Sequence, residues 1–490
     1  MLDIAGKRVT VMGLGRFGGG VGVTRWLASQ GADVLVTDLD PADKLTESIA
    51  KVQDLIDHGS VTLRLGEHNV SDFTTCDIVV ANPAVPKPWD NRFLRAAQAA
   101  RIPITTEIRL LVERLPAGGR KRTVGITGSA GKSTTTTMTA HILRRVLGGE
   151  HVYLGGNIGG SLLGELSKIR ATDWVVLELS SAMLHWLGAG VGYADAQGWS
   201  PTIGVITNIS ANHIDWHGEF AHYARSKQQI FLSQRPSDLV IEGAVGEAIW
   251  TDGALSRRVR VQVDRASVDA VLATGLRLNV PGAHNRVNAV MASAAAAAAL
   301  ARESGGDADG AAPTMRAIGN AAALLADFKG LPHRLEFVGE YGGVKCYNDS
   351  KCTTPEAALL AIAAFEPEPG RSRVHLIAGG YDKGSDLSPV AKLAAGSGGG
   401  GAEPIAGLYT VGKTGPTIAA AARQAGADTN VVECGTLERA VQEAMSRSRP
   451  GDVLLLSPAC ASWDQFTNFE YRGEEFARLV RESGKVGVAT

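Results

Sequence analysis

The stretch Gly125-Ile126-Thr127-Gly128-Ser129-Ala130-Gly131-Lys132-Ser133-Thr134 is typical of a loop that holds nucleotide phosphates. Its glycines let backbone N–H groups turn toward phosphate oxygens, its lysine can reach the terminal phosphates, and a Ser or Thr hydroxyl can hold Mg²⁺. The pattern is Gly-x-x-Gly-Lys-Ser, shorter than the usual Gly-x-x-x-x-Gly-Lys-Ser, but a strand-like segment precedes it and a Thr-rich helical segment follows. We therefore predict nucleotide binding here rather than a structural glycine turn. The residues assigned to this site are Gly128, Ser129, Ala130, Gly131, Lys132, Ser133 and Thr134.

Length and composition describe an ordinary globular chain. Its 490 residues predict about three domains. A formal net charge of −1 gives no electrostatic bias toward nucleic acid or an anionic membrane. The five cysteines are scattered without a Cys-x-x-Cys pair, which suits a reducing compartment and argues against disulfides or a zinc site. With neither a signal-peptide pattern nor a bilayer-length apolar run, we expect a cytoplasmic protein, most simply a monomer, without membrane insertion or nucleic-acid binding.

The order of strand and helix patterns predicts three α/β domains in series. The first domain, 1–110, is Rossmann-like, the central domain, 111–329, contains the phosphate loop, and a second Rossmann-like domain occupies 330–490. Predicted strands lie at 9–12, 32–37, 76–81, 122–126, 174–178, 203–207, 343–347, 374–378, 407–411 and 453–457. Predicted helices lie at 21–30 and 221–232 and in the Ala-rich run 292–301, whereas 107–122 reads as a connection and 304–310 and 396–401 as surface loops.

A second glycine-rich turn follows the first predicted strand. Gly13-x-Gly15-x-x-Gly18 opens a helix as a dinucleotide fingerprint does, and the next strand ends in Asp38, where an acidic residue often meets a ribose. A hydride-transfer enzyme would leave the downstream phosphate loop unexplained. We therefore favour a phosphate-bearing substrate over NAD here, with a tight packing turn as the simplest competing interpretation.

Several polar residues of the central domain fall at strand ends or on predicted helices. Glu178 ends an apolar strand beside the phosphate loop and is a natural Mg²⁺ ligand, although a strand-end Glu is more often solvated. His213 is a candidate metal ligand, yet a lone His is more often structural, and Lys227 reads by default as part of a solvated helix face. Asn285 and Asn288 are one helical turn apart, so both amides can face one ligand.

Three polar segments follow strands of the third domain. They are 348–351, 379–384 and 457–466, and each contains Lys, Ser or Asp. Because the carboxyl ends of parallel strands meet at one edge of a sheet, we expect these segments to converge. Together they predict a binding site for a small, polar, anionic molecule.

At these motifs the chain resembles the Mur ligase family. The resemblance covers nearly the whole chain and rests on 127–133, 156–159, 177–181, 284–288, 330–334 and 348–351, and the C-terminal 457–469 and 472–476 resemble the glutamate-adding members. It implies that ATP phosphorylates the carboxylate of UDP-N-acetylmuramoyl-L-alanine, that the amino group of glutamate attacks the acyl phosphate, and that phosphate leaves. Cations must neutralise the charge that develops in both steps, and two Mg²⁺ ions are expected.

The resemblance also implies a role for each matching residue. The catalytic set would be Lys132, Lys227, His213, His333 and Lys351, with magnesium held by Ser133, Glu178, His213 and a carbamylated Lys227. ATP would be held by the phosphate loop with Asn285, Asn288, Arg334 and Asp349. The UDP substrate would contact Gly13, Gly15, Arg16, Phe17, Gly18, Asp38, Asn157 and Ser180, and glutamate would contact Thr353, Lys383, Ser462 and Phe469. Because these residues belong to separate domains, domain closure is expected.

Some positions depart from the family pattern. Asn82-Pro83-Ala84 replaces Ser-Pro-Gly, Ala182-Met183 replaces Phe-Gln, Asn212 replaces the Asp before the metal-binding His, Cys352-Thr353-Thr354 replaces Ala-Thr-Asn, and 188–199 reads as an insertion. These differences bear on the uridine pocket, the sugar–peptide contacts and the stereochemistry of glutamate. The alternatives left open are an L-glutamate-adding variant, a folylpolyglutamate-type ligase, a nicotinamide-dependent oxidoreductase and a non-catalytic nucleotide-binding regulator.

Overall fold

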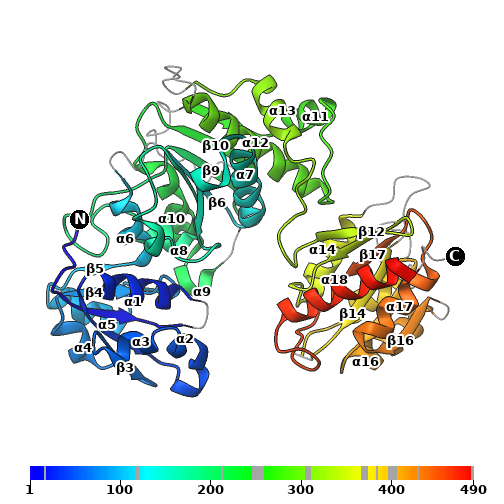
Figure 1. The fold of residues 1–490 in the computed structure, drawn as a ribbon, viewed down its shortest axis with the longest axis horizontal. Helices are drawn as coiled ribbons and strands as arrows, with labels where there is room; N and C mark the ends of the chain where they lie inside the picture. The colour runs from blue at the N-terminus through cyan, green and yellow to red at the C-terminus, as the bar shows by residue number, and fades with distance from the viewer. Residues whose placement is uncertain are drawn as a thin grey trace. The chain divides into compact units, whose positions relative to one another are not determined.

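The computed structural model describes residues 1–15, 18–116, 122–210, 213–244, 259–303, 311–365, 374–381, 384–394, 405–427 and 430–486. The chain divides into two compact units, each described here by itself. Unit 1 contains Met1–Leu276 and Val287–Leu325, and unit 2 contains Arg277–Arg286 and Ala326–Thr490. Parallel strands with helices between them recur along the whole chain (Figure 1), which confirms the predicted α/β class. The expected loops at 304–310 and 396–401 lie outside the described residues.

Unit 1 begins with a five-stranded parallel sheet in the order β3-β2-β1-β4-β5. Its strands are β1 (Arg8–Met12), β2 (Asp33–Asp38), β3 (Val61–Leu65), β4 (Ile78–Ala81) and β5 (Ile104–Thr105). Its helices are α1 (Gly19–Ser29), α2 (Thr46–Ala50), α3 (Gln53–Asp57), α4 (Val70–Thr74), α5 (Arg92–Ala99) and α6 (Glu107–Arg114), with a 3₁₀ turn η1 (Ala42–Lys44). The strand order reverses between β1 and β4, and doubly wound sheets bind ligands outside the carboxyl ends of the strands at such a point.

Helix α6 corrects the prediction that 107–122 is a connection. The charged residues suggested a linker, but Ile108, Leu110 and Leu111 are fully buried in the core that the sheet shares with the next domain. The Thr106 hydroxyl accepts a hydrogen bond from the Arg109 backbone N–H and caps the helix. The apolar spacing within a charged segment is therefore an amphipathic helix that covers the sheet.

The central sheet has six strands in the order β11-β10-β9-β6-β8-β7, all parallel. They are β6 (Thr123–Thr127), β7 (Val152–Gly156), β8 (Trp174–Glu178), β9 (Ile203–Asn208), β10 (Leu239–Ala244) and β11 (Val259–Gln262). The helices are α7 (Lys132–Leu147), α8 (Ser181–Trp186), α9 (Ile214–His217), α10 (Phe220–Leu232), α11 (Arg265–Ala273), α12 (Ala283–Glu303) and α13 (Met315–Ala323), with 3₁₀ turns η2 (Gly149–His151) and η3 (Leu163–Glu165). Strands β6, β8 and β9 are almost fully buried because a parallel sheet is covered on both faces.

The segment 188–199, which reads as an insertion, is fastened to the N-terminal domain. The backbone N–H of Ile104 in β5 donates to the carbonyl of Gly192 at 3.0 Å. Arg109 of α6 is 1% exposed, and its guanidinium donates to the carbonyls of Trp186, Gly188 and Gln197. A buried guanidinium needs such acceptors, because leaving its N–H groups unpaired would be costly. The segment therefore closes over helix α6 and joins the first two domains.

Unit 2 is built on a six-stranded sheet in the order β12-β13-β17-β14-β15-β16, in which only the β12–β13 pair is antiparallel. The strands are β12 (Glu336–Tyr341), β13 (Val344–Asn348), β14 (Val374–Gly379), β15 (Gly407–Val411), β16 (Val431–Gly435) and β17 (Val453–Leu456). The helices are α14 (Pro355–Ala363), α15 (Ser388–Ala394), α16 (Gly415–Gln424), α17 (Leu437–Arg447) and α18 (Phe469–Val486). Strands β13, β17 and β14 are neighbours, so the prediction that three polar strand ends share one edge is confirmed.

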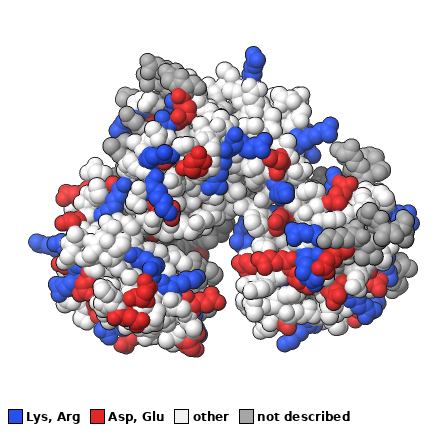
Figure 2. Space-filling model, viewed as in Figure 1, with Lys and Arg blue, Asp and Glu red and all other residues white. Residues whose placement is uncertain are grey.

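Two features of the described residues bear on whether the protein could contact a membrane or a nucleic acid. None of their helices combines the length and the hydrophobicity that crossing a lipid bilayer requires. On the face drawn in Figure 2, Lys and Arg side chains alternate with Asp and Glu side chains. This face therefore presents no single-sign stripe of the kind that a nucleic acid contacts.

Candidate active site

The phosphate loop joins β6 to α7 and depends on two glycines. Gly128 has φ +149°, and a Cβ there would lie 1.9 Å from the Thr207 hydroxyl oxygen. Gly131 has φ +81°, and a Cβ there would lie 2.5 Å from Oδ1 of Asn288. Any larger residue at either position would have to displace these neighbours. The predicted nucleotide residue Asn288 thus lies against the loop, and Ser133 and Thr134 follow in the first turn of α7.

Asn208, at the end of β9, holds the loop in this conformation. Its Oδ1 accepts a hydrogen bond from the Ala130 N–H at 2.9 Å, and its Nδ2 donates to the Ala130 carbonyl at 3.0 Å. The Ser129 hydroxyl also lies 2.7 Å from the Tyr223 hydroxyl of α10. Asn208 and Tyr223 were not predicted as site residues, although Asn208 opens a polar strand end that the sequence displays. Both residues hold the loop in this conformation.

Two lysines meet beneath the loop. Lys132 Nζ lies 3.0 Å from the Gly128 carbonyl, and Lys227 Nζ lies 2.9 Å from the same oxygen and 3.2 Å from the Thr127 hydroxyl. Lys227 is 1% exposed, so the default interpretation of a solvated helix face is wrong. Burial lowers the pKa of Lys227 well below its usual value, and the nearby charge of Lys132 lowers it further. Lys227 therefore loses its proton more readily than an ordinary lysine.

Glu178 ends β8 on the other side of β6 with one oxygen left unsatisfied. The side chain is 1% exposed, and its Oε1 accepts a hydrogen bond from Asn157 Nδ2 at 2.9 Å. Its Oε2 is buried, and no described residue forms a hydrogen bond with it. A buried orphan carboxylate oxygen is costly, and a cation would satisfy it. The side chain thus fits the predicted magnesium ligand.

The rest of a magnesium shell would come from oxygens of other kinds. Within the described ranges no three His, Cys, Asp or Glu side chains are grouped closely enough to hold a metal ion. Mg²⁺ commonly keeps several waters and binds through one or two carboxylates together with substrate phosphates. Glu178 and the Ser133 hydroxyl suit that kind of site. His213 is exposed and begins α9 in a left-handed conformation, with φ 52°.

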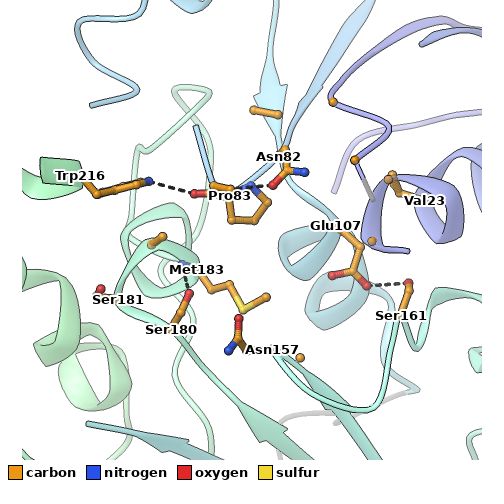
Figure 3. Close-up of a pocket in the computed structure, with 18 of the residues that line it drawn as sticks. Val23, Asn82, Pro83, Glu107, Asn157, Ser161, Ser180, Ser181, Met183 and Trp216 are labelled. Carbon is orange, nitrogen blue, oxygen red and sulfur yellow. Dashed lines mark hydrogen bonds between the residues drawn. The ribbon is translucent and has the colours of Figure 1, made fainter. Parts of the chain in front are cut away.

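One cavity of unit 1 connects the glycine turn after β1 with the phosphate loop. It has a volume of ≈ 630 Å³, and its lining includes Gly13, Gly15, Asn82, Gly128, Lys132, Asn157, Ser180, His213 and Lys227. Figure 3 shows Asn82 and Pro83, which follow β4, across the cavity from Asn157 and Ser180 of the central domain. Part of the predicted UDP-binding set is therefore brought to one space with part of the phosphate loop, whereas Gly18 and Asp38 are not in the lining.

The glycine turn is braced by Asp38. One carboxylate oxygen of Asp38 accepts from the Gly15 N–H at 2.9 Å, and the other accepts from the Asp40 N–H at 2.9 Å. Gly18 precedes α1 with φ 87°, a left-handed conformation that favours glycine. Ser180 caps α8 by accepting from the Met183 N–H at 3.1 Å. The predicted UDP contacts Arg16 and Phe17 lie outside the described residues.

A group of histidine and tryptophan rings borders the cavity beyond α8. His217 is 1% exposed, with Nε2 2.9 Å from the Ser181 hydroxyl and Nδ1 2.8 Å from Nδ1 of His222. His185 packs edge-on against Trp89 and Trp216. Burial, assisted by neighbouring His222, lowers the pKa of His217 to about 3 and that of His185 to about 4. These rings are therefore neutral in the folded protein near neutral pH.

The half-buried His185 ring predicts a loss of stability in mild acid. Below pH 6.5 the unfolded chain takes up a proton at this residue, whereas the folded chain does not until about pH 4, so stability falls through that window. His185→Phe keeps a ring but cannot titrate, and it should remove about 1–2 kcal/mol of the stability loss between pH 7.5 and pH 5. Thermal melts at both pH values check this, with His58→Gln on the exposed surface as the control. An equal fall in wild type and His185→Phe would contradict it.

In unit 2 the predicted catalytic residues surround the end of β13. Asp349 accepts hydrogen bonds from the Leu335 N–H at 3.2 Å and the Ser457 hydroxyl at 2.8 Å, and burial raises its pKa to about 6. Lys351 Nζ lies 5.3 Å from the centre of the Phe469 ring, and the His333 ring meets that ring edge-on at 5.8 Å. His333 and Lys351 therefore both contact Phe469, and Asp349 lies at the same strand end; the roles assigned to these residues stay predictions.

The other predicted residues of unit 2 differ from one another in how exposed they are. Ser462 is buried after β17, Thr353 is half-buried, and Arg334 is exposed. Asn285 is buried and donates to the Pro281 carbonyl at 2.6 Å. Lys383 lies outside the described residues.

Arg472 of α18 connects two of the three strand ends. It donates to the Ser350 hydroxyl at 3.0 Å and to the Cys460 carbonyl at 3.0 Å. Its Nη1 is buried, and none of the residues that the structure describes accepts a hydrogen bond from it. Burial lowers its pKa to about 10. The C-terminal motif contains Arg472, but its bracing position was not predicted.

Comparison with known proteins covers nearly the whole chain. Family models described as "Mur ligase MurD-like, N-terminal domain", "Mur ligase middle domain" and "Mur ligase, glutamate ligase domain" match residues 7–106, 126–247 and 333–460. A UDP-N-acetylmuramoylalanine–D-glutamate ligase of Acidobacterium capsulatum is 34% identical over 98% of this chain and 97% of its own length. The same-named protein of a Roseiflexus species is 36% identical over 98% of this chain and 99% of its own length.

Solved structures show the same fold at low sequence identity. The chain is similar to UDP-N-acetylmuramate-alanine ligase of Thermotoga maritima, with a TM-score of 0.51, 18% identity and coverage of 97% of this chain and 100% of that one. It is also similar to a MurF of Acinetobacter baumannii, with a TM-score of 0.52, 15% identity and coverage of 96% and 93%.

Proposed function

Because this chain belongs to the Mur ligase family, we propose that it is an ATP-dependent ligase that adds D-glutamate to UDP-N-acetylmuramoyl-L-alanine during synthesis of peptidoglycan precursors. The observation that carries the proposal is the single cavity that runs from the glycine turn after β1 to the phosphate loop. A nucleotide-linked acid that fills it would place its diphosphate at one end and its carboxylate at the other. We assign UDP-substrate binding to 1–110, ATP binding to 111–329 and amino-acid binding to 330–490.

The reaction proceeds in two steps. A carboxylate oxygen of the substrate attacks the γ-phosphorus of ATP, the bond to the β-phosphate oxygen breaks, and ADP leaves. The glutamate nitrogen then attacks the acyl carbon, an amide bond forms, inorganic phosphate leaves, and the amine releases its proton. Phosphorylation is needed because a free carboxylate oxygen is a very poor leaving group.

Both steps concentrate negative charge at the phosphate loop. The loop N–H groups and the start of α7 bind phosphate oxygens, and Lys132, which touches its own loop, would turn toward the transferring phosphoryl group. Glu178 and Ser133 would hold Mg²⁺, which would supply charge neutralisation when bound. Asn208 fixes the loop so that its donors are aimed before ATP arrives.

Lys227 has the chemistry of a lysine that becomes carbamylated. A buried amine with a strongly lowered pKa exposes a lone pair that attacks CO₂, giving a carbamate and releasing a proton. The product carries a negative charge, which would attract cations that an ammonium repels. We therefore assign Lys227, with His213, to a second magnesium site.

The residues of unit 2 serve the amino acid and the nucleotide. Lys351 would neutralise phosphate charge, and Asp349 holds the turn before it through Leu335 and Ser457. Ser462, Thr353, Lys383 and Phe469 would hold glutamate, and Asn285, His333 and Arg334 would contact ATP.

Phosphate release tests the proposed reaction. With ATP, Mg²⁺ and UDP-N-acetylmuramoyl-L-alanine, release should depend on added D-glutamate, and the peptide product should increase in equal amount. L-Glutamate and no amino acid are the parallel controls. A preference for L-glutamate would keep the mechanism and assign the chain to the L-glutamate-adding variant. No amino-acid-dependent release with either enantiomer would overturn the proposed function.

A further inference from the structure

A carboxyl group lines the middle of the cavity in unit 1 and has no part in the reaction described above. Glu107 is the first residue of α6, and one of its carboxyl oxygens accepts a hydrogen bond from the Ser161 hydroxyl at 2.7 Å. Both residues line the cavity. In Figure 3 the Glu107 carboxyl group lies at a level between Asn82, which follows β4, and Asn157, which follows β7. Ser161 thus orients the group toward the space between the two domains.

The surroundings of Glu107 are not those of an acidic residue that stabilises the start of a helix. An acidic side chain in the first turn of a helix is usually favourable because it is solvated and faces the positive end of the helix dipole. Here the side chain is half-buried, and burial raises its pKa, opposed only by the Ser161 hydrogen bond. Among the described residues no Lys, Arg or His forms an ion pair with it. A carboxyl group held partly out of water without a cation points to a ligand that satisfies it.

The rest of the lining suggests which part of a ligand reaches Glu107. One end of the cavity has the N–H groups of the glycine turn and of α1, and the other end has Lys132 and Lys227, so both ends suit anions. A carboxylate between them disfavours an anion in the middle. The proposed substrate has that charge pattern, with a diphosphate, then a neutral sugar that carries hydroxyl and acetamido N–H donors, then a carboxylate.

We propose that Glu107 is a positioning and specificity residue, whose carboxyl group accepts a hydrogen bond from a hydroxyl or amide N–H of the substrate's sugar and keeps the substrate in register. The inference rests on the proposed function. A substrate shifted along the cavity would bring its diphosphate or its carboxylate against Glu107, and like charges at close range oppose that arrangement. The correct register leaves the terminal carboxylate beside the phosphate loop.

Calorimetric titration with two ligands tests the proposal. Glu107→Ala should weaken binding of UDP-N-acetylmuramoyl-L-alanine by about 10–150-fold, the range of a lost hydrogen bond to a charged group, and should leave UDP binding within about twofold. Ser161→Ala, which keeps the carboxyl group but removes its orienting donor, should give a smaller loss with the same split. Glu150→Ala removes an equal charge from an exposed side chain and should change neither titration.

The outcomes separate the two proposals. Equal weakening of UDP and of the full substrate in both variants would mean that Glu107 is merely structural and would overturn the inference. Unchanged binding of the full substrate would also overturn it. If the wild-type protein binds UDP-N-acetylmuramoyl-L-alanine no more tightly than it binds UDP, then the proposed function itself fails. Should Glu107→Ala not fold, as a thermal melt would reveal, Ser161→Ala alone decides the question.

Discussion

Lys132→Ala is expected to lower kcat by at least about a thousandfold while the protein stays folded, because the charge that develops on the transferring phosphoryl group would lose its nearest cation. Lys132 is held against its own loop by the Gly128 and Ser129 carbonyls, at 3.0 and 3.2 Å. These contacts are local, and Asn208 and Thr207 secure the loop independently. The variant should therefore lose charge stabilisation without losing the loop.

Amino-acid-dependent phosphate release measures the effect, and a thermal melt checks that the variant is folded. Lys168→Ala is the matched control, because that side chain is 65% exposed and forms a surface ion pair with Glu165. It should keep the wild-type rate. A folded Lys132→Ala protein that also kept the wild-type rate would remove the assignment of the phosphate loop.

Lys227→Ala should be nearly as inactive, for a different reason. The carbamate would be lost together with the cation that it attracts, so the loss should approach that of Lys132→Ala. Formate, acetate or a high bicarbonate concentration should restore part of the activity, because a small carboxylate can occupy the space and supply the missing negative charge. No such rescue is expected for Lys132→Ala, since it lacks a positive charge.

The modification itself is directly observable. Wild-type protein equilibrated with ¹³C-labelled CO₂ should give a carbamate carbon signal in NMR that is absent from Lys227→Ala. The signal should weaken in acid, because a protonated amine cannot attack CO₂ and a carbamate decomposes when it is protonated. Wild-type activity in a folded Lys227→Ala protein would show that the carbamate plays no part in this chain.

The sequence predicted those parts of the molecule that have a local signal. Each of these parts has a composition that is typical of one kind of structure. They are the two glycine turns, the buried strands β6, β8 and β9, and the Ala-rich part of α12. Helix α6 was missed because its charges outweighed its apolar spacing. Strand β7 was missed because it is short and ends in two glycines, so its pairing with β8 rather than its own residues makes it a strand.

The candidate site could be predicted as a set of strand ends, but not as a set of contacts. The burial of Lys227 depends on Thr127 and Gly128, which are about a hundred residues away in the sequence. Nothing in the sequence near Asn208 indicates that its side-chain amide will form hydrogen bonds with both the N–H and the carbonyl of Ala130. Glu107 looks like an ordinary helix-start glutamate until Ser161 is placed beside it. Such roles are fixed by tertiary packing, which a single sequence does not display.

The way in which Arg109 holds the segment 188–199 has a consequence for sequence drift. All of its hydrogen bonds to that segment and to Trp186 end on main-chain carbonyls, which every amino acid possesses. The side chains that Arg109 does not contact are therefore freer to change, with two exceptions: at Gly192 a Cβ would lie 2.1 Å from the Ile104 carbonyl oxygen, and Tyr193 donates a hydrogen bond from its hydroxyl to Glu113 of α6. At this junction between two domains, replacing Arg109 would remove the hydrogen bonds, whereas replacing a residue that offers only its carbonyl would not.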